Sequence, residues 1–99
     1  MSEFYIDQDG RRQGEHDRYY PNGELWETIN YKNNQKHGYQ FSFYSDGGLH
    51  QVIEWFEGVL HGDYKVWNTQ GDLELHEIYI DGISAYTVLD ERSESNEKG

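Results

Sequence analysis

Apolar side chains recur along the chain in columns spaced 24 residues apart. The clearest columns are an aromatic one, a leucine one and a second aromatic one: Tyr19, Phe43 and Trp67; Leu25, Leu49 and Leu73; Tyr31, Trp55 and Tyr79. Agreement across several columns indicates a tandem repeat. The runs between turn signals are short and rich in aromatic and β-branched residues, which favours strands over helices.

Glycine follows the same period in three registers: Gly14, Gly38 and Gly62; Gly23, Gly47 and Gly71; Gly10, Gly58 and Gly82, with Asn34 in the one missing place. Asparagine is the residue that best tolerates positive φ after glycine. The substitution therefore keeps the backbone requirement of its register.

Each repeat contains the signature of a β-hairpin. Tyr20-Pro21-Asn22-Gly23 places proline, asparagine and glycine where a three-residue hairpin loop with a bulge needs them. Weaker versions occur at 45–47 and 69–71. The turn would pair Tyr20 with Glu24 and set Tyr19 opposite Leu25, so an aromatic–leucine stripe would follow these turns.

The strands expected from these signals are 3–7, 15–20, 24–32, 39–44, 48–56, 63–68, 72–80 and 84–89. Joined in order they form an all-β antiparallel meander of tandem 24-residue hairpins, an open, twisted, single-layer sheet. Only 34% of the residues are apolar, so no thick core is expected. Stability would come from the backbone ladder and from cross-strand pairs.

The motifs resemble the MORN repeat, in particular the variant described for toxin–antitoxin systems. Its units run as His-Gly, an aromatic strand, Asn-Gly-x-Leu, a second strand with an aromatic, and an Asp-Gly-type turn. Residues 37–58 and 61–82 carry that pattern, and residues 13–34 carry it with Gln13 and Asn34 as replacements. The resemblance covers about residues 4–85 and implies an interaction module with antitoxin-like or protein-binding roles, or the scaffolding and membrane roles of longer eukaryotic arrays.

The repeats divide the chain into a domain at 1–89 and a tail. The domain would hold a half repeat at 1–10, repeats at about 11–34, 35–58 and 59–82, and a terminal strand at 83–89. Residues 90–99 contain no apolar side chain. This segment is therefore expected to be a disordered acidic tail.

The formal net charge is −11, with only eight Lys and Arg residues. That balance argues against direct binding to nucleic acid or to an anionic membrane, and it favours a basic partner. The chain has no cysteine, no apolar stretch long enough to cross a membrane and no signal-peptide pattern. We therefore expect a cytoplasmic protein.

No residue pattern points to catalysis. His37 and His61 are one repeat apart and are expected at turns, and the other histidines share no ligand spacing, so no metal site is predicted. Nineteen acidic residues make paired carboxylates inevitable. The glycines are turn residues rather than a phosphate loop, and no serine sits in a nucleophile elbow. We expect neither an enzyme nor a cofactor.

Sixteen aromatic residues are more than a thin sheet can hide, so several should face solvent, as in binding surfaces. Acidic residues run through the whole array and could mimic a phosphate track, although a purely solubilising role is equally compatible with the sequence. The residues predicted to bind a partner combine acids with aromatic anchors: Asp17, Trp26, Glu27, Glu54, Trp55, Phe56, Glu57 and Glu74.

The function expected from these residues is inhibition of a basic protein such as a nuclease toxin or a defence effector. The chain would act as an antitoxin, an immunity protein or a phage-encoded anti-defence protein, and as an acidic nucleic-acid mimic. Two alternatives stay open. One is a structural scaffold or self-assembling module that dimerises through a sheet edge or its aromatic face, and the other is a carbohydrate-binding sheet.

Overall fold

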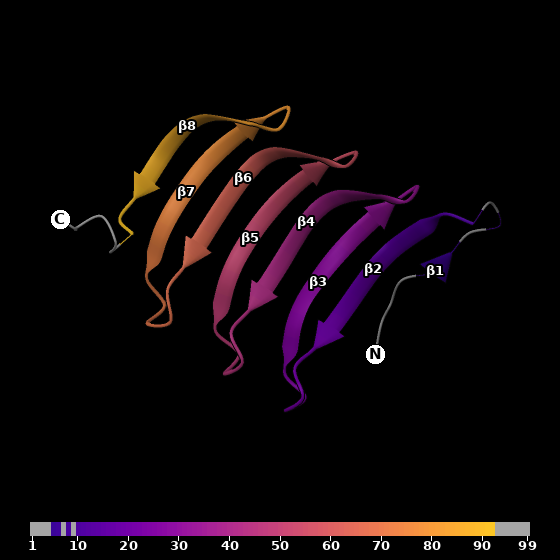
Figure 1. Cartoon of the computed structure of the whole chain (residues 1–99), viewed down its shortest axis with the longest axis horizontal. Coiled ribbons are helices and arrows are strands. Elements are labelled where there is room, and N and C mark those ends of the chain that lie inside the picture. The colour runs from indigo at the N-terminus through magenta and orange to yellow at the C-terminus, as the bar shows by residue number, and fades with distance from the viewer. Residues whose placement is uncertain (1–4, 7, 9, 93–99) are drawn as a thin grey trace.

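The computed structural model of the chain describes residues 5, 6, 8 and 10–92. Within these residues all regular structure is β, in one antiparallel meander whose strands follow their sequence order (Figure 1). The strands are β1 (Tyr5–Ile6), β2 (Arg12–Tyr19), β3 (Leu25–Lys32), β4 (Gln35–Phe43), β5 (Leu49–Phe56), β6 (Val59–Trp67), β7 (Leu73–Ile80) and β8 (Ile83–Asp90). The predicted fold class is confirmed.

Turns at one end of the sheet follow the predicted three-residue loop. The Tyr20 amide donates to the Glu24 carbonyl at 2.9 Å, and Gly23 has a φ of 93°. Tyr19 lies opposite Leu25 across a register shift that marks a β-bulge. The pairs Phe43–Leu49 and Trp67–Leu73 repeat this geometry. We call these connections the long turns.

At the opposite end the connections are two-residue turns, which we call the tight turns: 33–34, 57–58 and 81–82. Both residues of each have positive φ, for example 49° at Glu57 and 85° at Gly58. Positive φ at both positions defines a type I′ turn, whose twist matches that of the flanking strands. Asn34 has a φ of 73°, so it adopts the same left-handed conformation as Gly58 and Gly82 in the later repeats.

Each tight turn is also tied to the hairpin before it. The Gly58 amide donates to the Lys36 carbonyl and the Gly82 amide to the Leu60 carbonyl, both at 2.8 Å. The Asn34 amide makes the equivalent bond to the Arg12 carbonyl at 3.0 Å. The tight turns therefore form a hydrogen-bonded row along one end of the sheet.

The predicted starts of three strands were wrong. Strands β2, β4 and β6 begin at 12, 35 and 59 instead of 15, 39 and 63. The cause is that Gly14, Gly38 and Gly62, read as turn residues, lie inside strands, with φ of 84°, 90° and 110°. Gly38 and Gly62 lie at bulges. His37 and His61 likewise lie within β4 and β6 rather than at turns.

The predicted boundaries at the two ends of the chain are met in part. Strand β8 reaches Asp90, one residue past the predicted end of the domain, and the Glu91 amide donates to the Glu74 carbonyl at 2.7 Å. Residues 93–99 of the predicted tail lie outside the described residues, as do residues 1–4 of the predicted half repeat.

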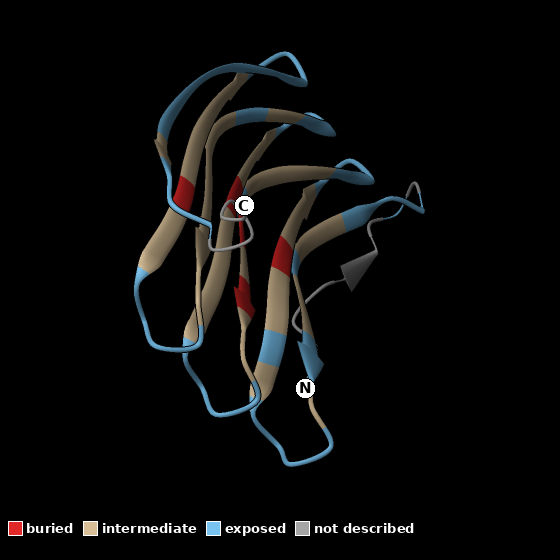
Figure 2. Ribbon diagram, turned by 60° about the vertical axis from the view of Figure 1, so that its left-hand side comes forward, coloured by how far each residue is buried: buried red, intermediate tan, exposed pale blue. Residues whose placement is uncertain are grey.

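Few side chains are buried in the part of the chain that the structure describes: Ile29, Gln40, Ser42, Ile53 and Leu75 (Figure 2). Ile29, Gln40 and Ile53 are direct cross-strand partners, so they share a face. The described residues measure 54 × 36 × 15 Å, the dimensions of one layer. The lean core expected from the composition is what the fold contains.

Candidate protein-binding surface

The two faces of the sheet differ in burial. Cross-strand pairing places all five buried residues on one face, which we call the buried face. The other face, which we call the open face, carries the aromatic–leucine stripe next to the long turns. Among the residues whose burial is described, seven of the nine exposed large apolar side chains lie on the open face: Tyr19, Tyr39, Phe56, Val59, Ile80, Ile83 and Tyr86.

Two predicted binding residues on the buried face are engaged by one cation. The guanidinium of Arg18 lies 4.7 Å from the centre of the Trp26 ring, and its Nη1 donates to Glu27 Oε2 at 3.0 Å. The Glu27 side chain is only 13% exposed. The negative charge of Glu27 is therefore neutralised within the chain before any partner arrives.

The remaining predicted residues on the buried face also have internal partners. Trp55 donates from Nε1 to Oε1 of the buried Gln40 at 2.9 Å, and Lys36 Nζ lies 4.7 Å from its ring centre. Glu74 accepts from Asn68 Nδ2 at 3.0 Å. These contacts give Trp55 a structural role in satisfying Gln40, since an unpaired buried amide is costly.

Asp17, Glu54 and Phe56 lie on the open face. Asp17 is half-buried, and its Oδ1 has no hydrogen-bond partner among the described residues. Glu54 accepts from the Asp63 amide at 3.1 Å and packs against Gly62. Phe56 is 53% exposed. Of these three residues, Phe56 presents the most apolar surface to solvent.

Glu57 completes the predicted set and lies exposed in a tight turn. The eight predicted residues are thus divided between two faces and a turn, and the structure does not bring them together as one surface. Alternation along each strand could have been read from the sequence, but the bulges shift which residues share a face.

Sequence reasoning missed five exposed side chains of the open face besides Tyr19: Tyr39, Val59, Ile80, Ile83 and Tyr86. A signal for some of them was available. The position before each tight turn changes from Lys32 to Phe56 to Ile80 along the repeats. Such a change at an equivalent position marks an apolar residue that the fold does not require.

Charge is distributed unevenly along the array. Residues 10–44 hold five Lys or Arg and four Asp or Glu, a net charge of +1, whereas residues 45–92 hold two and ten, a net charge of −8. The acids that seemed to run through the whole sequence are therefore balanced in the first half and unbalanced in the second. The second half is the part with the potential to attract a basic partner.

The negative potential raises the pKa of a tyrosine on the open face. The pKa of Tyr39 is raised, chiefly by the charge of Glu54 and further by burial and by the charge of Asp63. Asp63 also contacts His76 Nε2 at 2.9 Å. Glu54 and Asp63 therefore place acidic charge beside an exposed aromatic ring.

The described residues contain no cluster of three His, Cys, Asp or Glu side chains that could hold a metal ion. They also enclose no pocket. Among the same residues there is no helix long and apolar enough to cross a membrane.

Comparison with known proteins finds a match to a protein family. The family described as MORN repeat variant matches residues 12–33, which comprise β2, the long turn, β3 and the first residue of the following tight turn. The match supports the MORN repeat family, and the same turn and bulge geometry recurs in the β4–β5 and β6–β7 hairpins. No curated protein and no solved structure matches the chain.

Proposed function

We propose that the chain is a non-enzymatic, protein-binding inhibitor that neutralises a basic bacterial effector. It would serve as an antitoxin, as an immunity protein or as a phage-encoded anti-defence protein, in line with the toxin–antitoxin variant of the MORN repeat. The effector would be a nuclease or another protein with a basic groove.

One observation carries the proposal, namely that acidic charge and exposed apolar side chains coincide in residues 45–92. This segment has a net charge of −8, and it includes Phe56, Val59, Ile80, Ile83 and Tyr86 on the open face. Protein interfaces combine apolar anchors with a charged rim, and complementary charge speeds association. A surface that only solubilises the chain would need the acids without the exposed apolar residues.

The test uses a matched pair of charge variants. Glu57→Asn with Asp81→Asn removes two acids from tight turns and installs the residue that the first tight turn has at Asn33, with a φ of 51°. Asp46→Asn with Asp72→Asn removes two acids from the long turns at the other end of the sheet. Both variants change the net charge equally.

The partner for this test is a basic bacterial nuclease, and the readouts are inhibition of its activity and the association rate at low and high salt. The tight-turn variant should associate several-fold more slowly than the long-turn variant, because charges near the contact act most strongly. Equal rates for the two variants, or wild-type association insensitive to salt, would remove the acidic mechanism.

A self-assembling scaffold is the second candidate, favoured by strand β8. Its residues Ile83, Tyr86 and Val88 are exposed, and it is the last strand of the described sheet. However, its register against β7 shifts twice, and bulges in an edge strand hinder pairing with another sheet. The mass of the chain in solution separates this candidate from the first.

A further inference from the structure

The residues that flank the tight turns differ between repeats although their backbones agree. Lys32 pairs with Gln35, Phe56 with Val59, and Ile80 with Ile83, and each pair closes a type I′ turn. Because the first turn forms with a polar pair, the geometry places no demand for apolar residues at these positions.

The four apolar residues at the second and third turns also keep much of their surface in water. Phe56, Val59, Ile80 and Ile83 are exposed by 53%, 41%, 50% and 72%. Apolar surface stabilises a fold only to the extent that it leaves water, at about 25 cal/mol per Å². The surface that these side chains leave in water is available to a partner.

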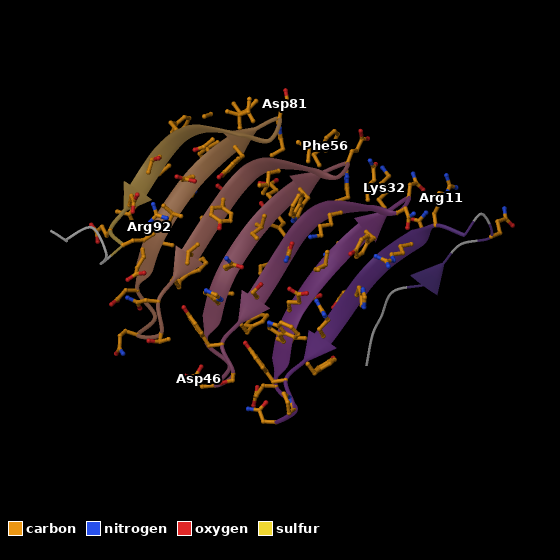
Figure 3. All side chains as sticks on the ribbon, viewed as in Figure 1. Arg11, Lys32, Asp46, Phe56, Asp81 and Arg92 are labelled. Atoms are coloured by element: carbon orange, nitrogen blue, oxygen red, sulfur yellow. The ribbon has the colours of Figure 1, made fainter. Side chains whose placement is uncertain are left out.

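These four residues form one continuous surface, which we call the tip patch. Each cross-strand pair lies on the open face, and Val59 Cγ1 lies 3.5 Å from the place a Cβ would take at Gly82. Val59 therefore bridges the second pair to the third turn. Figure 3 places Lys32, Phe56 and Asp81 along the same end of the sheet, with Asp46 at the other.

The patch is rimmed by acids and held by two histidines. Glu57 and Asp81, both exposed, occupy the two turns. The Glu57 amide donates to His37 Nδ1 at 3.2 Å, and the Asp81 amide donates to His61 Nδ1 at 3.3 Å. The rings of His37 and His61 lie 5.2 Å and 6.2 Å from that of Phe56. Both turns are thus fixed before a partner binds, which lowers the cost of ordering them.

We propose that the tip patch binds a short basic, amphipathic segment of a protein partner. Its apolar side chains would cover the four patch residues, and its Lys or Arg side chains would lie against Glu57 and Asp81. This inference rests on the proposed function for the existence of a basic partner. Charge selects the occupant, because a second copy would bring the same two acids against each other.

The test replaces the apolar pairs of the patch with the Lys–Gln pair that flanks the first tight turn, Lys32 and Gln35. The patch variant carries Phe56→Lys, Val59→Gln, Ile80→Lys and Ile83→Gln. A control variant carries Tyr19→Lys and Tyr39→Lys, which adds the same charge at two exposed rings of the open face outside the patch. Circular dichroism and the melting temperature establish that both variants keep the fold.

The probe is a short synthetic peptide of alternating lysine and leucine, compared with peptides of lysine and serine and of glutamate and leucine. In ¹H–¹⁵N spectra the first peptide should shift the amides of residues 56–59 and 80–83, and the other two should not. The patch variant should bind it at least about tenfold more weakly than the control variant, which corresponds to about 1.4 kcal/mol. Equal binding by the two variants would overturn the assignment.

Two further measurements separate the alternatives. A wild-type dimer that the patch variant converts to a monomer in sedimentation would assign the patch to a second copy and overturn the proposal. Neutralisation of a basic effector by the patch variant at wild-type potency would overturn the patch while leaving the proposed function standing. Peptide binding at the patch without neutralisation of any effector would overturn the proposed function while leaving the patch standing as a binding site.

Discussion

The first and last tight turns share one backbone and present opposite surfaces. Asn33–Asn34 and Asp81–Gly82 both have positive φ throughout, yet the first is flanked by Lys32 and Gln35 and the last by Ile80 and Ile83. The net charge changes from +1 in residues 10–44 to −8 in residues 45–92. Positions that differ between equivalent repeats are those the backbone leaves free, and these carry the proposed binding.

A second comparison lies on the buried face, where one column of pairs changes along the repeats. The ring centres of Tyr20 and Trp26 lie 5.8 Å apart, and those of the stacked Tyr44 and His50 lie 4.4 Å apart. At the third position Asn68 Nδ2 donates to Glu74 Oε2. The hydroxyls of Tyr20 and Tyr44 each donate to a backbone carbonyl of the next repeat at 2.7 Å. The two members of each pair therefore stay in contact in all three hairpins, although the residue types change.

The largest effect is expected where a glycine is both strained and crowded. Gly71 has a φ of 91° and open space around it, so Gly71→Ala should cost about 1–2 kcal/mol for the left-handed backbone alone. At Gly62, with a φ of 110°, a Cβ would collide with the Glu54 carboxylate. Gly62→Ala should cost about 2–4 kcal/mol, since Glu54 must also release the Asp63 amide. Urea unfolding that gives equal costs would refute this.

Trp55→Phe should cost about 1–3 kcal/mol in the free energy of unfolding, because it leaves the buried Gln40 without the Trp55 Nε1 donor. The matched background is Gln40→Leu, in which no acceptor remains. A double-mutant cycle should show that the tryptophan hydrogen bond matters only when Gln40 is present. A cost that is the same in both backgrounds would mean that Trp55 contributes by packing alone.

The pairing register could be predicted from the sequence, whereas the faces could not. Tyr20-Pro21-Asn22-Gly23 determines a turn type, and that turn sets Tyr19 opposite Leu25 through local geometry. Gly38 was misread because positive φ serves bulges as well as turns. Each bulge changes which residues share a face. Glu27 and Glu54 lie on opposite faces because of bulges that form only when the strands pair, and the local sequence does not show where they form.

A pH effect is expected from the middle member of the buried-face column. Burial lowers the pKa of His50, so the unfolded chain binds the proton more tightly than the folded chain. Stability from this residue is complete above about pH 6.5 and is lost as the pH falls through and below that value. His50→Trp, which copies the Tyr20–Trp26 pair, should unfold with a smaller loss of stability between pH 7 and pH 5. Parallel curves for the two proteins would contradict this.

The smallest effect is expected from a direct exchange between tight turns. Gly58→Asn copies Asn34, whose φ of 73° is close to the 85° of Gly58, and it should change the free energy of unfolding by less than about 0.5 kcal/mol. Gly58→Val should cost about 1–2 kcal/mol at the same position, because a β-branched residue is strained at positive φ. Thermal melts that rank the two variants equally would show that the turns are not equivalent.

Hydrogen exchange of the chain, free and bound to the basic protein that we propose it neutralises, measures most directly whether binding is confined to the second half of the array. The tight turns offer an internal reference, because their amides are hydrogen-bonded alike in both halves. We predict slower exchange on binding at residues 56–59 and 80–83, with no change at residues 32–35. Equal protection at residues 32–35, or protection only at the long turns, would contradict the assignment of the second half as the binding surface.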